Sequence, residues 1–146
     1  MSGPDPGRRA RSPILGNLLR DAALPGAGGL KRVVASTRNS LRGLRDGLAT
    51  EAAVRQEFAL LVLGLPLSFF VASSLWVWVA LVATLLAVLT VEFLNSALER
   101  LCNHVTPERH EAIRVTKDFA SAAVMFALII AGLVWGAAVL EHVGIV

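Results

Sequence analysis

An uncharged stretch of 34 residues, from Phe58 to Val91, limits the folds open to this chain. As one straight helix it would be about 51 Å long, whereas the hydrocarbon core of a membrane is about 30 Å thick. We therefore expect it to fold back once, at Ala72-Ser73-Ser74, with Trp76 and Trp78 as interfacial anchors after the turn. A second uncharged stretch, Phe119 to Leu140, has 22 residues, which is enough for a further span.

The predicted fold class is an all-α membrane protein with three transmembrane helices, at about 57–72, 75–98 and 119–140. An amphipathic helix over 30–56 is predicted to precede them in the headgroup plane, because Leu and Val fall mainly on one side and Arg on the other. An ordinary surface helix is the alternative. The membrane domain is predicted to cover 30–142. Residues 1–29, rich in Pro and Gly and without a recognisable secretory signal, are expected to form a flexible cytoplasmic tail.

The composition limits the kinds of binding partner that we expect for this chain. Hydrophobic residues make up 55% of it, the net charge is +3 and the pI is about 10.0. In a chain this apolar, basicity indicates anionic headgroups or a phosphate substrate rather than nucleic acid. A single cysteine, Cys102, excludes an internal disulfide and a cysteine-type metal site.

The basic residues predict the topology. Ten of the 14 Lys and Arg precede the first predicted span, and the other four lie between the second and third spans. None lies in the 72–75 turn or after the third span. The positive-inside rule therefore puts the N-terminus and the 100–117 connection in the cytoplasm and the C-terminus outside.

Three polar residues share one helical face where the second span ends. Glu92, Asn95 and Glu99 follow one another at i, i+3 and i+7. Leu75 to Glu92 corresponds to about 25 Å of helix, so Glu92 is expected near the inner edge of the hydrocarbon and Glu99 about 10 Å further out. Ionisable groups are costly in a span, and for that reason they suggest function.

The residues at the cytoplasmic interface leave two hypotheses open. Carboxylates beside cations suit phosphoryl transfer, in which acids hold Mg²⁺, cations neutralise phosphates and one acid accepts the proton of the attacking hydroxyl. Alternatively, the stripe only joins helices and forms ion pairs in a non-enzymatic membrane protein. The interfacial charges concerned, besides the stripe itself, are Glu51, Glu57, Lys117, Asp118 and Arg32.

Three motifs resemble those of the prokaryotic integral-membrane diacylglycerol kinase family: 51–57 (EAAVRQE), 91–99 (VEFLNSALE) and 117–124 (KDFASAAV). Their order and spacing and the three-span plan are similar over Leu30 to His142. The resemblance implies a homotrimer in the bacterial inner membrane, with active sites where protomers meet. The implied activity is ATP- and Mg²⁺-dependent phosphorylation of diacylglycerol to phosphatidic acid at the cytoplasmic face. Undecaprenol kinase, found among related members, is the alternative; 51–57 and 117–124 are more similar to the diacylglycerol branch.

The resemblance also implies roles for single residues. Glu92 would be the catalytic base on the lipid hydroxyl, with Asn95 supporting the site from the same face. Glu51 and Glu99 would hold Mg²⁺ with ATP, and Lys117 would contact the phosphates. Further positions that match substrate or nucleotide contacts of the family are Arg32, Asn39, Ser40, Arg55, Gln56, Glu57, Glu108, Arg109, His110 and Asp118.

The chain departs from the family pattern at a few places. Asn39 stands where an aromatic residue is common, and Arg109 stands where one also occurs. The extension 1–29 is longer than the usual N-terminus of the family.

Overall fold

The computed structural model describes residues 29–105 and 110–145, and in these residues it contains helices and no strand, which confirms the all-α fold class. The tail 1–28 and the predicted site residues Glu108 and Arg109 lie outside the described residues. The chain divides within its first helix into a unit that ends at Arg42 and a unit that begins at Gly43, and we describe each by itself. The helices are α2 (Gly29–Thr50), α3 (Ala52–Val71), α4 (Leu75–Val105) and α5 (Glu111–His142).

The prediction of one continuous helix over 30–56 is wrong, because the chain breaks at Glu51. This residue is extended, with φ −102° and ψ 120°, and α3 starts directly after it. The last carbonyl groups of a helix lack partners within it. Here the guanidinium of Arg55 donates to the carbonyl oxygens of Leu48 and Ala49, at 3.4 and 3.5 Å. Arg55 therefore stabilises the end of α2 from the first turn of α3.

The turn predicted at 72–74 is confirmed. Ala72 is extended, with φ −68° and ψ 125°, and α4 begins at Leu75. The hydroxyl oxygen of Ser74 accepts a hydrogen bond from the backbone N–H of Val77 at 3.3 Å. This is the arrangement of a serine N-cap, so Ser74 stabilises the start of α4 directly after α3 has ended at its C-cap Ala72.

The helices on both sides of the second connection are longer than predicted. We expected the spans to stop at 98 and to resume at 119, but α4 continues to Val105 and α5 begins at Glu111, where the Nδ1 of His110 accepts from the backbone N–H of Ala112 at 3.3 Å. Charged residues are compatible with an α-helix, so a helix can continue beyond the hydrocarbon core of the membrane. The 31 residues of α4 would measure about 46 Å, which exceeds a hydrocarbon core by about 16 Å.

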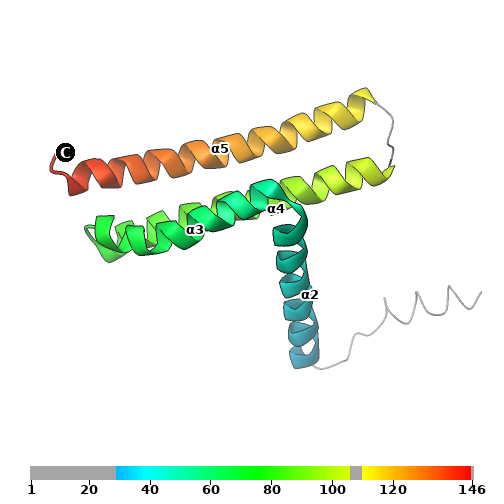
Figure 1. Cartoon of the computed structure of the whole chain (residues 1–146), viewed down its shortest axis with the longest axis horizontal. Coiled ribbons are helices and arrows are strands. Elements are labelled where there is room, and N and C mark those ends of the chain that lie inside the picture. Colours follow the sequence, from blue (N-terminus) through cyan, green and yellow to red (C-terminus); the bar gives the residue numbers. More distant parts are fainter. Residues whose placement is uncertain (1–28, 106–109, 146) are drawn as a thin grey trace, which may run out of the picture. The chain divides into compact units, whose positions relative to one another are not determined.

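The helices α3, α4 and α5 lie side by side, with α4 antiparallel to both of the others (Figure 1). α4 packs against α3 and α5, whereas α3 touches α5 only slightly. The start of α3, the end of α4 and the start of α5 therefore meet at one end of this unit. Each helix is long and apolar enough to cross a membrane, as the sequence predicted.

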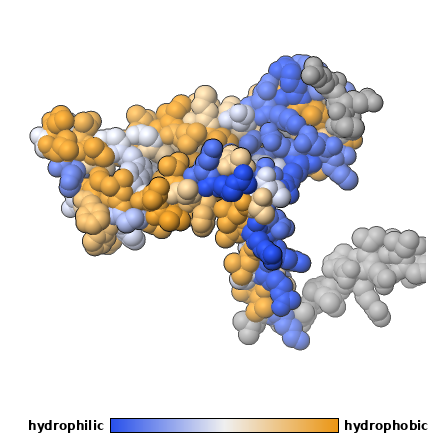
Figure 2. Space-filling model, viewed as in Figure 1, coloured by the Kyte–Doolittle hydropathy of each residue, from blue (hydrophilic) through white to orange (hydrophobic). Residues whose placement is uncertain are grey.

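The surface of the three helices suits a lipid environment. Phe70 on α3 is 73% exposed, and Phe126 and Leu133 on α5 are 60% and 69% exposed. Many other large hydrophobic side chains of these helices are exposed as well. On the face that Figure 2 shows, hydrophobic residues dominate the part of this unit away from the α4–α5 connection, and hydrophilic residues gather toward that connection. The interfacial position of α2 and the side of the membrane that holds the N-terminus stay predictions.

Two small apolar clusters hold the unit together. The cluster nearer the α4–α5 connection contains the buried Val54, Leu61 and Leu89, with Phe58 and Phe93 packed against them. The cluster at the other end contains the buried Val71, Leu81 and Ala138, with the Trp135 indole packed against them. The Nε1 of Trp135 donates to the backbone carbonyl oxygen of Leu81 on α4 at 3.3 Å.

Candidate active site

The polar stripe of α4 lies toward the end of the unit that holds the α4–α5 connection. Glu92 and Ser96 are buried, at 5% and 7% exposure, although both are polar. Asn95 is half-buried and Glu99 is exposed. The side chains of Asn95 and Ser96 lie beside the Glu92 carboxylate. Glu92 is thus held inside the packing of α4, while Glu99, about 10 Å further along the helix, is open to solvent.

Three segments bring carboxylates together around Glu92. Glu51 lies at the α2–α3 junction, Glu57 lies on α3 and Glu99 lies on α4. All three are close enough to Glu92 to interact with it electrostatically. Like charges at this range repel, and the repulsion is larger where burial lowers the local dielectric constant. Positive charges would reduce this repulsion, and one cationic side chain of the protein lies beside the cluster.

That cation is Arg100, which was not among the predicted site residues. Its Nε and Nη2 both donate to the same oxygen of Glu51, Oε1, at 2.9 and 2.6 Å. Nη2 also bonds to the hydroxyl of Thr50. The extended residue between α2 and α3 is thus bound to the C-terminal part of α4.

Two buried polar atoms near Glu92 have no hydrogen-bond partner among the described residues. They are Oε2 of Glu57 and Oδ1 of Asn95. Leaving a buried acceptor unpaired is unfavourable, so such atoms call for a specific explanation. A ligand hydroxyl or a water molecule that binds between α3 and α4 would satisfy them.

The start of α5 contributes charged groups at the same end. Nζ of Lys117 donates to Oδ1 of Asn103 on α4 at 2.8 Å. Asp118 pairs with Arg114 at 2.5 Å, and Arg114 also pairs with Glu111 at 2.6 Å. Asn103, like Arg100, was not among the predicted site residues.

Other predicted site residues are not brought to this cluster by contacts within the Gly43–Val146 unit. Arg32, Asn39 and Ser40 belong to the other unit, where they are exposed on α2, and Arg42 donates to Oδ1 of Asn39. Gln56 is exposed on α3. The roles assigned to these residues, and to Arg55 and His110, which have the structural contacts given above, stay predictions.

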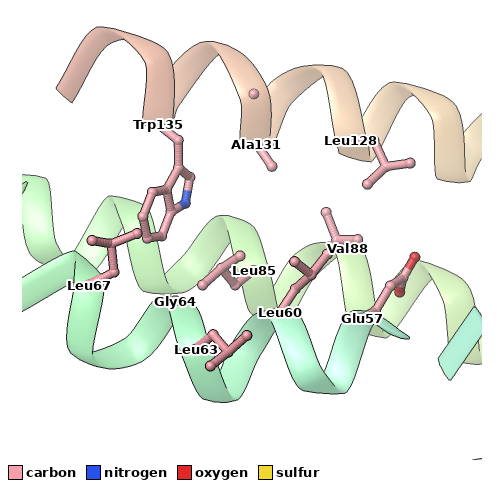
Figure 3. Close-up of a pocket in the computed structure, with 11 residues that line it drawn as sticks. Glu57, Leu60, Leu63, Gly64, Leu67, Leu85, Val88, Leu128, Ala131 and Trp135 are labelled. Carbon is pink, nitrogen blue, oxygen red and sulfur yellow. The ribbon is translucent and has the colours of Figure 1, made fainter. Parts of the chain in front are cut away.

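An apolar groove of about 360 Å³ runs between α3, α4 and α5. Glu57 lies at one end of it and Trp135 toward the other, with the Trp135 ring directed from α5 toward the other two helices (Figure 3). Glu57 to Leu67 on α3 corresponds to about 15 Å of helix. Val88, one turn before Glu92, also lines the groove. The groove therefore ends beside the carboxylate cluster.

Besides Glu57, one lining residue of this groove stands out in the sequence. Trp135 is the single Trp in the second uncharged stretch, Phe119 to Leu140, where its N–H needs a partner. The other lining residues are apolar side chains that do not differ in the sequence from lipid-facing ones. They are Leu60, Leu63, Gly64, Leu67, Leu85, Val88, Leu128, Ala131 and Gly132.

The carboxylates suit a magnesium ion that shares its coordination with a phosphate. In the part of the chain that the structure describes, no three His, Cys, Asp or Glu side chains are placed to hold a metal by themselves. Mg²⁺, however, commonly takes one or two carboxylates and completes its shell with substrate phosphates and water. Glu51, whose Oε1 takes both bonds from Arg100, and the exposed Glu99 fit this mode as the two protein ligands.

Taken together, these features define a helical membrane protein with several spans and a carboxylate-rich site at one end of them. Residues 38–139 match the model of a family described as prokaryotic diacylglycerol kinase. The chain belongs to the prokaryotic diacylglycerol kinase family.

Named relatives agree with this assignment. A diacylglycerol kinase of Haemophilus influenzae is 38% identical over 108 residues, which are 74% of this chain and 92% of that protein. One of Escherichia coli is 33% identical over 116 residues, 80% and 95% of the two chains. One of Pseudomonas aeruginosa is 37% identical over 110 residues, 75% and 89%.

Family membership makes this chain a lipid kinase and a multi-pass bacterial membrane protein. It is therefore an enzyme, a transferase, and the hypothesis of a protein that only associates helices does not hold. The resemblance found in the three motifs is confirmed.

Proposed function

We propose that this chain phosphorylates diacylglycerol to phosphatidic acid with ATP, at the cytoplasmic face of the bacterial inner membrane. One observation carries the proposal: the buried Glu92 carboxylate lies where an apolar groove between three membrane helices meets a cluster of charged residues. A lipid hydroxyl and a phosphate donor could meet only at such a boundary. The names of the relatives favour diacylglycerol as the lipid.

The groove is proposed to hold an acyl chain. Its lining is apolar apart from Glu57, and its length along α3 suits about ten methylene groups. A chain lying there would bring the polar end of the lipid to Glu57 and Glu92. The unpaired Oε2 of Glu57 and Oδ1 of Asn95 would then accept hydrogen bonds from lipid or water.

Glu92 is proposed as the general base. Its carboxylate takes the proton from the free hydroxyl of diacylglycerol while that oxygen forms a bond to the γ-phosphorus of ATP. The bond from this phosphorus to the bridging oxygen of ADP breaks, and ADP leaves with the electron pair. The proton on Glu92 passes to solvent afterwards. Asn95, beside Glu92 on the same helix, keeps the carboxylate directed to the lipid.

Glu51 and Glu99 are proposed to hold Mg²⁺ together with the phosphates. When bound, this ion neutralises charge on the transferring phosphoryl group and orients it. Lys117 adds a second positive charge beside the phosphates, and Asp118 lies next to it. The proposed nucleotide contacts outside the cluster are Arg32, Asn39, Glu108, Arg109 and His110, and those near either substrate are Ser40, Arg55 and Gln56.

The membrane face and the assembly are also part of the proposal. The distribution of Lys and Arg favours a cytoplasmic position for the N-terminus and the α4–α5 connection. A homotrimer with active sites between protomers is proposed from the resemblance of the motifs to the family.

A transfer assay tests the proposal. The purified chain in mixed micelles is given γ-labelled ATP, Mg²⁺ and either diacylglycerol or undecaprenol. The proposal expects label in phosphatidic acid and little in the polyprenol. Label only in polyprenyl phosphate would establish undecaprenol kinase activity instead, and label in neither lipid would contradict both substrates.

A further inference from the structure

We propose that Arg100 is a positioning residue for the metal site, because it holds Glu51 so that one carboxylate oxygen faces the bound cation. This inference rests on the proposed function, since it takes Glu51 as a ligand of Mg²⁺. It adds a residue that none of the predicted roles includes.

Arg100 donates to only one of the two carboxylate oxygens of Glu51. Both Nε and Nη2 donate to Oε1 of Glu51, at 2.9 and 2.6 Å, while Oε2 takes no hydrogen bond from any residue the structure describes. Arg100 itself is anchored, since it also bonds to the Thr50 hydroxyl, which donates to the carbonyl oxygen of Asp46 at 2.9 Å. The rigid guanidinium plane therefore fixes which oxygen of Glu51 remains available.

Glu51 needs such a support because of its place in the chain. It is the extended residue between α2 and α3, and among the described residues the hydrogen bonds to its carboxylate come from Arg100 and Thr50. Arg100 directly follows Glu99 on α4. The two proposed metal ligands are therefore connected through adjacent residues of one helix, and a shift of α4 would move both. Groups that orient metal ligands in this way typically contribute about ten- to a hundredfold to metal affinity.

The sign of the effect separates positioning from simple charge. A cation beside a metal site repels the metal, so removing its charge alone would strengthen metal binding. Removing a positioning residue weakens metal binding, because Glu51 then has to be ordered when the metal binds. The two explanations predict opposite changes in the same measurement.

The test measures binding of Mn²⁺, used as a spectroscopic stand-in for Mg²⁺, to the full chain in micelles with a non-hydrolysable ATP analogue. Paramagnetic resonance of free Mn²⁺ gives the dissociation constant. We expect Arg100→Gln to raise it about tenfold and Arg100→Lys to raise it less, because lysine can still pair with Glu51 although it lacks the guanidinium fork that selects one oxygen. Arg45→Gln is the matched control: Arg45 is exposed on α2 and makes no hydrogen bond within the described part of the chain, so the constant should stay within about twofold.

Three results would overturn the inference: an unchanged or tighter constant in Arg100→Gln, an undiminished effect of Arg100→Gln in a Glu51→Gln background, or no saturable Mn²⁺ binding by the parent. If Arg100→Gln does not fold, Arg100→Lys alone decides, since it must still weaken binding. Kinetics provide a second measurement, in which the KM for Mg²⁺ rises and that for diacylglycerol does not. A parent that binds Mn²⁺ through Glu51 but transfers no phosphoryl group to diacylglycerol would contradict the proposed function and leave the role of Arg100 intact.

Discussion

Lys117 on α5 donates from Nζ to Oδ1 of Asn103 on α4, at 2.8 Å. A long, flexible side chain is thereby held in one place before any phosphate binds. The residues come from opposite sides of the α4–α5 connection, 14 positions apart in the chain. In the proposed role of Lys117 as a phosphate contact, Asn103 would lower the entropy that Lys117 loses on binding the nucleotide.

Replacing Asn103 tests this relationship. Asn103→Leu should raise the KM for ATP about three- to tenfold, the range of one ordinary hydrogen bond, with a smaller change in kcat. Asn103→Asp, which keeps an acceptor at the same place, should stay near the parent value. Steady-state kinetics at saturating lipid provide the measurement. An equal loss in both variants would show that the amide is needed for something other than accepting from Lys117.

Glu99→Gln addresses the metal role of the exposed end of the stripe. Removing this charge should raise the Mg²⁺ concentration for half-maximal activity about tenfold, because one of the two proposed carboxylate ligands is lost. The KM for diacylglycerol should not change, since Glu99 lies about two turns beyond Glu92 on the solvent side. A titration of activity with Mg²⁺ measures the shift. An unchanged Mg²⁺ dependence would contradict a role in metal binding.

Gly47 and Phe93 form a close contact between α2 and α4 next to Glu92. A Cβ atom on Gly47 would lie 2.5 Å from Cε1 of the Phe93 ring. Gly47→Ala should therefore destabilise the protein by about 1 kcal/mol, because the cost of overpacking exceeds the gain in helix propensity. Thermal unfolding in micelles measures the change.

Two further variants make that prediction specific. Gly43→Ala, on the same helix with nothing within 4 Å of the new Cβ, should not lower the unfolding temperature. Adding Phe93→Leu to Gly47→Ala should recover part of the loss, since the smaller side chain makes room. Equal effects of Gly47→Ala and Gly43→Ala would mean that the contact with Phe93 is unimportant.

The groove offers a test of lipid binding. Gly132 lines it on α5, and a Cβ there meets nothing within 4 Å, so Gly132→Leu places its Cβ without a clash and adds bulk to the groove wall. We expect the KM for long-chain diacylglycerol to rise severalfold and the KM for ATP to stay constant. Gly136→Leu is the control, because Gly136 is equally open and lies on the same helix outside the groove. The same loss in both variants would argue against an acyl chain in the groove.

The sequence predicted the three spans and the turn at 72–74 because two quantities decide them, the length of uncharged stretches and the thickness of a bilayer. It could not predict the break at Glu51. At that break Arg55 bonds to the end of α2 and Arg100 bonds to Glu51, and Arg100 comes from 49 positions further along the chain. Helix propensity alone favours continuation there, so local patterns led to the wrong boundary.

The candidate site divides in the same way. The stripe of Glu92, Asn95 and Glu99 was visible because helical spacing and the absence of charge before it are local properties. The tie from Asn103 to Lys117 and the groove ending at Glu57 depend on how helices pack, which no spacing within one helix reveals. The family motifs include Glu51 and Lys117, but they do not indicate the contacts of these residues with Arg100 and Asn103.

The most direct test of the account is phosphoryl transfer by Glu92→Gln. Losing the proposed general base should lower kcat at least a hundredfold, while the proposed oligomer and the binding of Mn²⁺ with an ATP analogue remain as in the parent. Transfer is measured with γ-labelled ATP and diacylglycerol, and assembly by chromatography in the same detergent. Retained kcat, or loss of activity that accompanies collapse of the oligomer, would contradict a catalytic Glu92 and indicate that its buried carboxylate serves the packing of α4.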